Sequence, residues 1–175
     1  MLATAAVFLL AGPASAVDVE PKALVLSPAD VPAGFRLDPD ESGVRTNERE
    51  GRDNPEARKL FSRWRRVTGY QAAYARRGSE IESRVDVLRS ASGARSLFRW
   101  VDEEMMKAGV LGLKRARAGI GAESRVYSGG TPVGFTLVAW RYGRVFAGIV
   151  SIGVPRDRVL ALARVQQRRI AAALR

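Results

Sequence analysis

The sequence VGFTLVAWRYGRVFAGIVSI, at residues 133–152, contains two apolar runs that are separated by a single polar turn. The first run is Val133 to Trp140 and the second is Val145 to Ile152, with Arg141-Tyr142-Gly143-Arg144 between them. Short apolar runs that flank a glycine-containing turn predict an antiparallel β-hairpin. Because these are the most hydrophobic strand candidates in the chain, we expect both of them in the middle of a sheet.

A second hairpin is predicted upstream of the first. In Glu80 to Leu88, small or apolar residues alternate with Glu82, Arg84 and Asp86, which is the pattern of a half-buried strand. The segment Tyr70 to Ala75 precedes it, across a glycine-containing turn. Two shorter strands are expected at residues 35–37 and 125–127.

Three helices are predicted between and after these strands. Capping and first-position proline signals start the first at Asn54-Pro55, and it is expected to continue to about Val67. The second is expected from Ser90 to about Lys107, and the third over the last twenty residues. The polar segment 38–54 is expected to be an exposed loop, the longest in the chain. The predicted fold is therefore α+β: an antiparallel sheet of about five to six strands with three helices packed against it.

The bulk composition indicates one folded domain. The chain has 175 residues, of which 46% are hydrophobic and 27% are charged, and these values exclude wholesale disorder. It contains no cysteine and no histidine. Serine–histidine–aspartate triads, cysteine–histidine dyads and the usual zinc sites are therefore excluded, and no cofactor is predicted.

The N-terminus has the features of a secretory signal peptide at residues 1–16. An uncharged apolar run ends at Gly12-Pro13, and the small residues Ala14-Ser15-Ala16 then form a cleavage site. The run of about ten residues is too short to span a bilayer. We therefore expect residues 17–175 to form a single extracytoplasmic domain. It should be secreted and not lipid-anchored, because no cysteine stands at the cleavage point.

The charge balance favours anionic partners. Lys and Arg number 29 against 18 Asp and Glu, which gives a formal net charge of +11. Such an excess attracts anionic lipids, cell-wall polymers or nucleic acid, although an arginine-rich composition can also follow from a GC-rich genome. Nucleic acid is not expected for an exported protein in which no strand interleaves aromatic and basic residues.

The predicted helix at residues 55–67 is the main candidate for a binding surface. An apolar face with Phe61 and Trp64 runs along it, and basic residues occupy its other faces. Such helices can lie on anionic surfaces. Equally, the apolar face can pack on the sheet while the arginines face water. The candidate residues for an anionic ligand are Arg58, Arg63, Arg65, Arg66 and Trp64. The residues that are expected to extend this basic surface are Arg115, Arg117, Arg164, Arg168 and Arg169.

Other motifs indicate turns and solvated side chains. Asp102, Glu103 and Glu104, with the acids of the 38–53 segment, are the candidates for a carboxylate pair, and we expect them to be solvated. Residues 38–43 match the start of a calcium loop, but Arg49 occupies the position of its last ligand, so no metal site is predicted. The glycines at 119, 121, 129 and 130 are interpreted as turn residues.

Several local patterns resemble those of exported actinobacterial α+β proteins of unassigned function. The opening Leu26-Ser27-Pro28-Ala29-Asp30-Val31-Pro32-Ala33-Gly34-Phe35 is similar to their Leu…Asp-Leu-Pro-x-Gly-Phe/Trp start, and Arg141-Tyr142-Gly143-Arg144-Val145 to their Arg-x-Gly-Asn-Val hairpin. Residues 94–98 and 163–170 resemble their central and closing helices. The layout also resembles extracellular sensor domains of mycobacterial kinases and the PsbP-like fold. These families share no catalytic residues, so the resemblance implies an exported binding or sensing module.

Three functional hypotheses follow from the sequence. The first is a non-enzymatic extracytoplasmic binding or sensor-like domain that contacts an anionic envelope component. The second is a cell-envelope module whose partner is another envelope protein. The third is a carboxylate-dependent hydrolase, for which two acids must face each other in a deep cleft.

Overall fold

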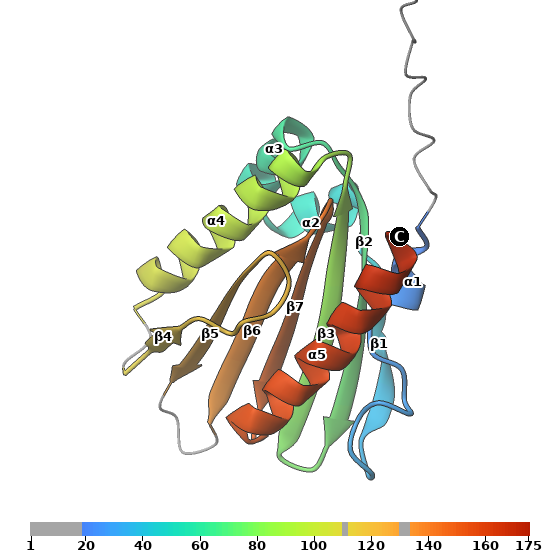
Figure 1. Ribbon diagram of the computed structural model, residues 1–175, viewed down its shortest axis with the longest axis vertical. Helices are drawn as coiled ribbons and strands as arrows, with labels where there is room; N and C mark the ends of the chain where they lie inside the picture. Colours follow the sequence, from blue (N-terminus) through green and yellow to red (C-terminus); the bar gives the residue numbers. More distant parts are fainter. Residues whose placement is uncertain (1–18, 110–111, 130–133) are drawn as a thin grey trace, which may run out of the picture.

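The seven strands of the computed structural model form one antiparallel sheet (Figure 1). The structure describes residues 19–109, 112–129 and 134–175, so the predicted signal peptide lies outside them. Across the sheet the order is β1-β2-β3-β7-β6-β5-β4, which places β7 at the centre. The strands are β1 (Arg36–Val44), β2 (Arg66–Arg76), β3 (Ser79–Leu88), β4 (Lys114–Ala116), β5 (Glu123–Gly129), β6 (Phe135–Tyr142) and β7 (Val145–Ile152).

Helices cover both faces of this sheet. Those of the described residues are α1 (Pro21–Leu24), α2 (Asn47–Asp53), α3 (Pro55–Arg63), α4 (Ala91–Lys107) and α5 (Arg156–Ala173). The predicted hairpins are confirmed as β2–β3 and β6–β7, and the α+β class is confirmed. The predicted element counts are too low, because the described residues form seven strands and five helices.

The segment that was predicted to be a loop contains most of β1, which is longer than the strand expected at residues 35–37, and all of α2, while α1 and β4 lie elsewhere and were not predicted. Residues 36–44 form the edge strand β1, which pairs with β2 only. An edge strand with two solvated faces needs no apolar alternation, so the sequence pattern does not reveal its full length. The pairing shifts register between Asp38 and Gly43, where Asp38 Oδ1 accepts hydrogen bonds from the amides of Asp40 and Glu41. Thr46 then caps α2 by accepting from the amide of Arg49.

Alternating side chains of the central strands divide the interior into two cores. Ile81, Val85 and Val87 of β3 face α1 and α5, in a core that includes Trp140 and Ile149. The alternate residues Glu82, Arg84 and Asp86 of β3 face α2, α3 and α4. The second core contains Phe61, Leu88, Leu97, Phe98, Leu137 and Phe146.

The N-terminal segment is fastened to the C-terminal helix and to the sheet. Figure 1 shows α1 beside the end of α5. Arg169 donates to the carbonyl of Val25 at 2.7 Å and pairs with Asp30 at 2.6 Å. Ser83 Oγ accepts from the amide of Leu26 at 3.0 Å and lies 3.0 Å from Gln166 Oε1, to which it donates. These buried contacts fix the face of the sheet that α5 covers.

The helix predicted over residues 55–67 ends earlier than its apolar pattern indicates. The last residue of α3 is Arg63, Trp64 caps it, and β2 begins at Arg66. Arg65 lies between them with φ of 54°, the left-handed conformation in which a helix commonly ends at glycine. Because the chain turns there, Val67 is exposed instead of facing the core.

Replacing Arg65 by glycine should stabilise the protein, because glycine adopts positive φ without a Cβ clash. We expect Arg65→Gly to raise the free energy of unfolding by about 1 kcal/mol, measured by urea denaturation. Arg65→Ala removes the same charge but keeps the strained Cβ, so it should give no comparable gain. An equal gain in both variants would contradict a conformational origin.

Candidate functional site

A buried ion pair lies where α2, α3 and β2 meet β3. Arg66 and Asp86 have side chains that are 0% and 2% exposed, and Arg66 donates from Nε and Nη2 to Asp86 Oδ1 at 2.7 and 2.5 Å. The remaining donors of Arg66 reach Asn47 Oδ1 at 2.6 Å and the carbonyl of Arg45 at 2.8 Å. The guanidinium also lies over the ring of Phe61, 4.7 Å from its centroid. Arg66 therefore joins the start of β2 to the segments on both sides of it.

A second arginine extends this network towards solvent. Arg84 Nε lies 3.1 Å from Asp86 Oδ2, and Arg84 Nη2 lies 2.9 Å from Glu50 Oε2 on α2. Burial by itself would raise the pKa of Asp86, but the guanidinium groups of Arg84 and Arg66 outweigh it and hold that pKa below its usual value. Burial likewise acts to lower the pKa of Arg84, but Asp86 and Glu50 raise it overall. Asp86 and Arg84 are therefore both charged at neutral pH.

Gly69 makes room for this network. A Cβ at this position would lie 2.5 Å from Arg66 Nη2, 2.5 Å from Asp86 Oδ1 and 2.6 Å from the carbonyl of Val85. Glycine is therefore required on β2 at the point where the ion pair crosses it. Gly69 follows the segment that was predicted to be helical to about Val67, but in the structure it lies inside β2.

Breaking the ion pair between Arg66 and Asp86 should strongly destabilise the folded protein. Asp86→Asn leaves Arg66 buried without its counter-charge, and we expect a loss of about 3–5 kcal/mol in the free energy of unfolding by denaturant titration. Asp40→Asn, at an exposed carboxylate, should change it by less than about 0.5 kcal/mol.

The stabilising effect of the Asp86 carboxylate should also depend on pH. A carboxyl whose pKa is lowered by folding stabilises the protein above its unfolded pKa of about 3.9. That contribution disappears as the pH falls through the lower, folded pKa. The difference between wild type and Asp86→Asn should therefore shrink as the solution is acidified, and a difference that is constant with pH would contradict the ionic role of Asp86.

A cleft of about 330 Å³ opens beside this network, between the sheet and the helices α2, α3 and α4. One part of its wall is apolar, and Trp100 and Phe61 are its aromatic members from the helices. The other part is polar. The apolar lining comprises Ala57, Phe61, Leu97, Trp100, Val101, Leu137, Phe146 and Val150, and the polar lining comprises Glu50, Asn54, Gln71, Glu82, Arg84 and Asp86.

Two positions in the cleft decide what it can hold. Glu82 is half-buried, and no residue that the structure describes forms a hydrogen bond or ion pair with its carboxyl. Burial raises the pKa of Glu82, with Arg45 as the main opposing charge. Gly148 of β7 lies next to Arg84 in the ladder and contributes no side chain, which leaves space in the middle of the wall.

The structure separates the five residues that were predicted to form a binding surface. Arg58, Arg63 and Arg65 are exposed, as the prediction requires. Arg66 is buried against Asp86, so the expectation that it contacts an external ligand is corrected: its charge is already neutralised inside the protein. Trp64 is half-buried and packs against Trp100, with ring centroids 6.0 Å apart.

Among the candidate carboxylates of α4, Glu103 and Glu104 are exposed as predicted, whereas Asp102 differs from the prediction. Asp102 is not solvated, because it accepts a hydrogen bond from Tyr127 and pairs with Arg115. Asp38 is used in the local turn of β1. Among the described residues, no three acids converge as a metal site. Sequence reasoning missed the cleft because Glu82, Arg84 and Asp86 were interpreted as a solvent face. The sequence feature that could have indicated the cleft is the mixture of acidic and basic residues on one face of β3, where Asp86 lies opposite Gly69 of β2.

Comparison with known proteins supports the fold. No protein-family model matches the chain, and no curated protein matches its sequence. The structure is similar to the extracellular domain of PknH from Mycobacterium tuberculosis, with a TM-score of 0.58 and 8% identity, over 88% of this chain and 97% of that one. At this identity the likeness shows a shared fold alone. It supports the resemblance to kinase sensor domains in fold, while the wider resemblance to exported actinobacterial proteins stays a prediction.

Because this likeness concerns the fold alone, the extracytoplasmic location stays a prediction. Among the helices of the described ranges, none combines the length and hydropathy of a membrane-spanning segment.

Proposed function

We propose that this protein is a non-enzymatic extracytoplasmic binding domain that holds a small amphipathic molecule in the cleft between the sheet and α2–α4. The observation that carries the proposal is the cleft itself, in which an apolar wall faces a polar wall that contains Glu82, whose carboxyl has no hydrogen-bond or ion-pair partner among the described residues. Its volume of about 330 Å³ is at the lower end of the range for small-molecule sites. The fold that it shares with an extracellular sensor domain agrees with this role.

The cleft's chemistry limits the ligand to one class. Trp100, Phe61 and Phe146 would bury an aliphatic or aromatic body. Glu82 can accept a hydrogen bond, and in its protonated form it can also donate one. A hydroxyl, amide or amine head group on an apolar body satisfies both walls.

Binding is favoured over hydrolysis by the state of the acids in the cleft. Glycoside hydrolysis needs one protonated carboxyl and one free carboxylate. The raised pKa of Glu82 suits the first role, but the carboxylates of Asp86 and Glu50 are held by arginines. Within the described residues, the cleft therefore lacks a free second carboxylate.

A larger side chain at Gly148 should fill the cleft and prevent ligand binding without destabilising the fold. A Cβ at Gly148 would be 3.7 Å from the carbonyl of Val138 and 3.9 Å from a methyl of Leu137, which are ordinary contacts. We expect Gly148→Val to raise the free energy of unfolding by about 0.5–1 kcal/mol, because valine favours strands, while it blocks the ligand. Gly148→Ala should be intermediate.

Binding can be followed by tryptophan fluorescence, with octyl glucoside below its micellar concentration and octylamine as probes. Glu82→Gln should weaken the binding of both probes by several-fold, whereas Glu80→Gln, at an exposed acid on the same strand, should not. Saturable binding that is undiminished in Gly148→Val, or the absence of binding to wild type, would contradict the cleft proposal.

A second candidate is the anionic envelope component predicted from the sequence. The observation that favours it is that Arg58, Arg63 and Arg65 are exposed at one end of the molecule, without a carboxylate partner among the described residues. Three unneutralised guanidinium groups attract phosphate or carboxylate polymers.

Charge reversal tests this surface without disturbing the buried pair. We expect Arg58→Glu, Arg63→Glu and Arg65→Glu together to abolish salt-sensitive sedimentation with vesicles that contain phosphatidylglycerol, leaving the unfolding midpoint nearly unchanged. Arg156, Arg158 and Arg164 of α5 are also exposed, and their reversal to Glu is the matched control. If both triple variants lose sedimentation with the vesicles equally, the binding depends on net charge alone and the specific surface is contradicted.

A further inference from the structure

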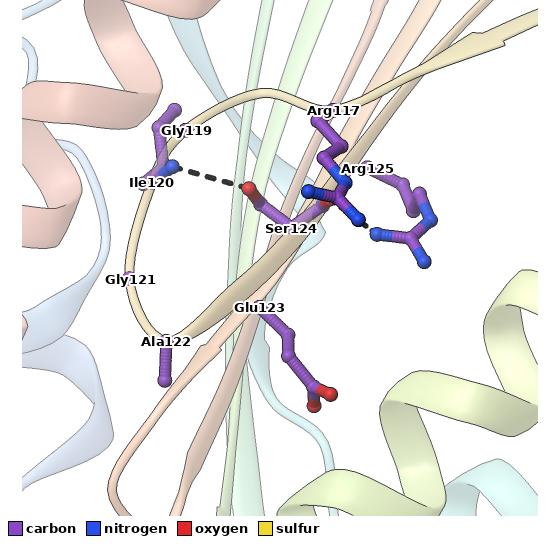
Figure 2. A pocket seen from close by; sticks show the side chains of 8 residues that line it. All are labelled: Arg117, Gly119, Ile120, Gly121, Ala122, Glu123, Ser124 and Arg125. Carbon is purple, nitrogen blue, oxygen red and sulfur yellow. Dashed lines mark hydrogen bonds between the residues drawn. The ribbon is translucent and has the colours of Figure 1, made fainter.

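Two adjoining hollows lie beside β4 and β5, and they share no lining residue with the cleft. The first, of about 370 Å³, is lined by residues 119–125 together with Arg117, as Figure 2 shows. The second, of about 290 Å³, is lined by Arg115, Ala116, Arg117 and Arg125. Arg117 and Arg125 line both hollows, and in Figure 2 their guanidinium groups lie close together.

The strand register explains why these two arginines meet. In the β4–β5 ladder, Arg115 is opposite Tyr127 and Ala116 is opposite Val126. Continued by one residue, the same register sets Arg117 opposite Arg125. Like charges that face each other across an antiparallel pair destabilise it, unless an opposite charge lies between them.

The neighbouring carboxylates do not provide that charge for Arg117. Asp102 is occupied by Arg115 and Tyr127, and lies 3.7 Å from Arg125 Nε. Glu123 pairs with Arg141 and lies 3.9 Å from Arg95. Arg117 is exposed and has no ion-pair or hydrogen-bond partner among the residues that the structure describes.

The other arginine is already held in position. Arg125 Nη1 donates to the carbonyl of Ser124 at 2.9 Å, and its guanidinium lies 5.7 Å from the centroid of the Phe98 ring. With the contact to Asp102, three interactions fix its orientation. A ligand at this point therefore meets one guanidinium that is preorganised and one that is free to close on it.

The loop that forms the rim is fixed as well. The amide of Ile120 donates to Ser124 Oγ at 3.1 Å (Figure 2), and the amide of Ala122 donates to the carbonyl of Arg141 at 2.8 Å. Gly119 and Gly121 have positive φ, which agrees with their interpretation as turn residues. A Cβ at Gly121 would lie 2.5 Å from the carbonyl of Arg141, so the loop packs directly on β6.

We propose that a phosphate-type oxyanion binds between Arg117 and Arg125, which line both hollows beside β4 and β5. Guanidinium groups form paired hydrogen bonds with the oxygens of phosphate and match its geometry better than ammonium groups do. The anion would neutralise the repulsion between the two arginines. This site is independent of the cleft and of the surface formed by Arg58, Arg63 and Arg65, because it shares no residue with either.

The test is a titration of the full chain with sodium phosphate against sodium chloride at equal ionic strength, followed by the backbone amide resonances. We expect saturable shifts centred on Gly119 to Arg125. Arg117→Gln should weaken phosphate binding about tenfold, as the loss of a charged hydrogen bond implies. Arg164→Gln removes the same charge from an exposed position on α5 and should bind as wild type does.

Equal phosphate affinity in Arg117→Gln and Arg164→Gln, or shifts that do not saturate, would overturn the proposal. Further arms distinguish the source of the phosphate. If glycerol phosphate binds and Arg117→Gln leaves sedimentation with phosphatidic acid vesicles unchanged, the ligand is a soluble phosphate ester. The other outcome is that Arg117→Gln also abolishes sedimentation with phosphatidic acid vesicles, while the triple variant of Arg58, Arg63 and Arg65 still shows the amide shifts caused by phosphate. In that case the same site binds a lipid head group.

Discussion

The buried pair between Arg66 and Asp86 is the constraint on which the cleft side of this protein depends. It joins the first residue of β2 to the C-terminal part of β3, two residues before that strand ends, and through Asn47 and the carbonyl of Arg45 it also holds the segment that leads into α2. Removing two charges from water is costly, so such a pair is tolerated only when its hydrogen bonds are satisfied. Here the donors of Arg66 are satisfied, which fixes where α2 and α3 lie over the sheet.

The strength of the hydrophobic pattern determined how much of the fold could be predicted from the sequence. The runs at 133–152 and the alternation at 80–88 are buried, and their strands were predicted correctly. Only the start of β1 was predicted, at residues 35–37, because the rest of this polar edge strand has no such pattern. The first helix was extended too far because Leu60, Phe61, Trp64 and Val67 keep helical spacing, although Arg65 turns the chain before Val67.

The candidate sites were harder to predict for a related reason. A basic residue in a polar run looks the same in sequence whether it is solvated, as Arg63 is, or buried against an acid, as Arg66 is. Only the distant partner, Asp86, decides between them, and it lies twenty residues away on another strand. The cleft and the arginine-lined hollow likewise combine residues from several elements, whose proximity is a property of the folded chain.

The two outer strands of the sheet are both strongly charged. β1 includes Arg36, Asp38, Asp40 and Glu41, and β4 is short and presents Lys114 and Arg115. Unpaired strand edges are the places where identical molecules add to one another, and charge on an edge opposes such addition. Copies of this protein that are crowded together should therefore remain separate instead of extending one another's sheets into fibres.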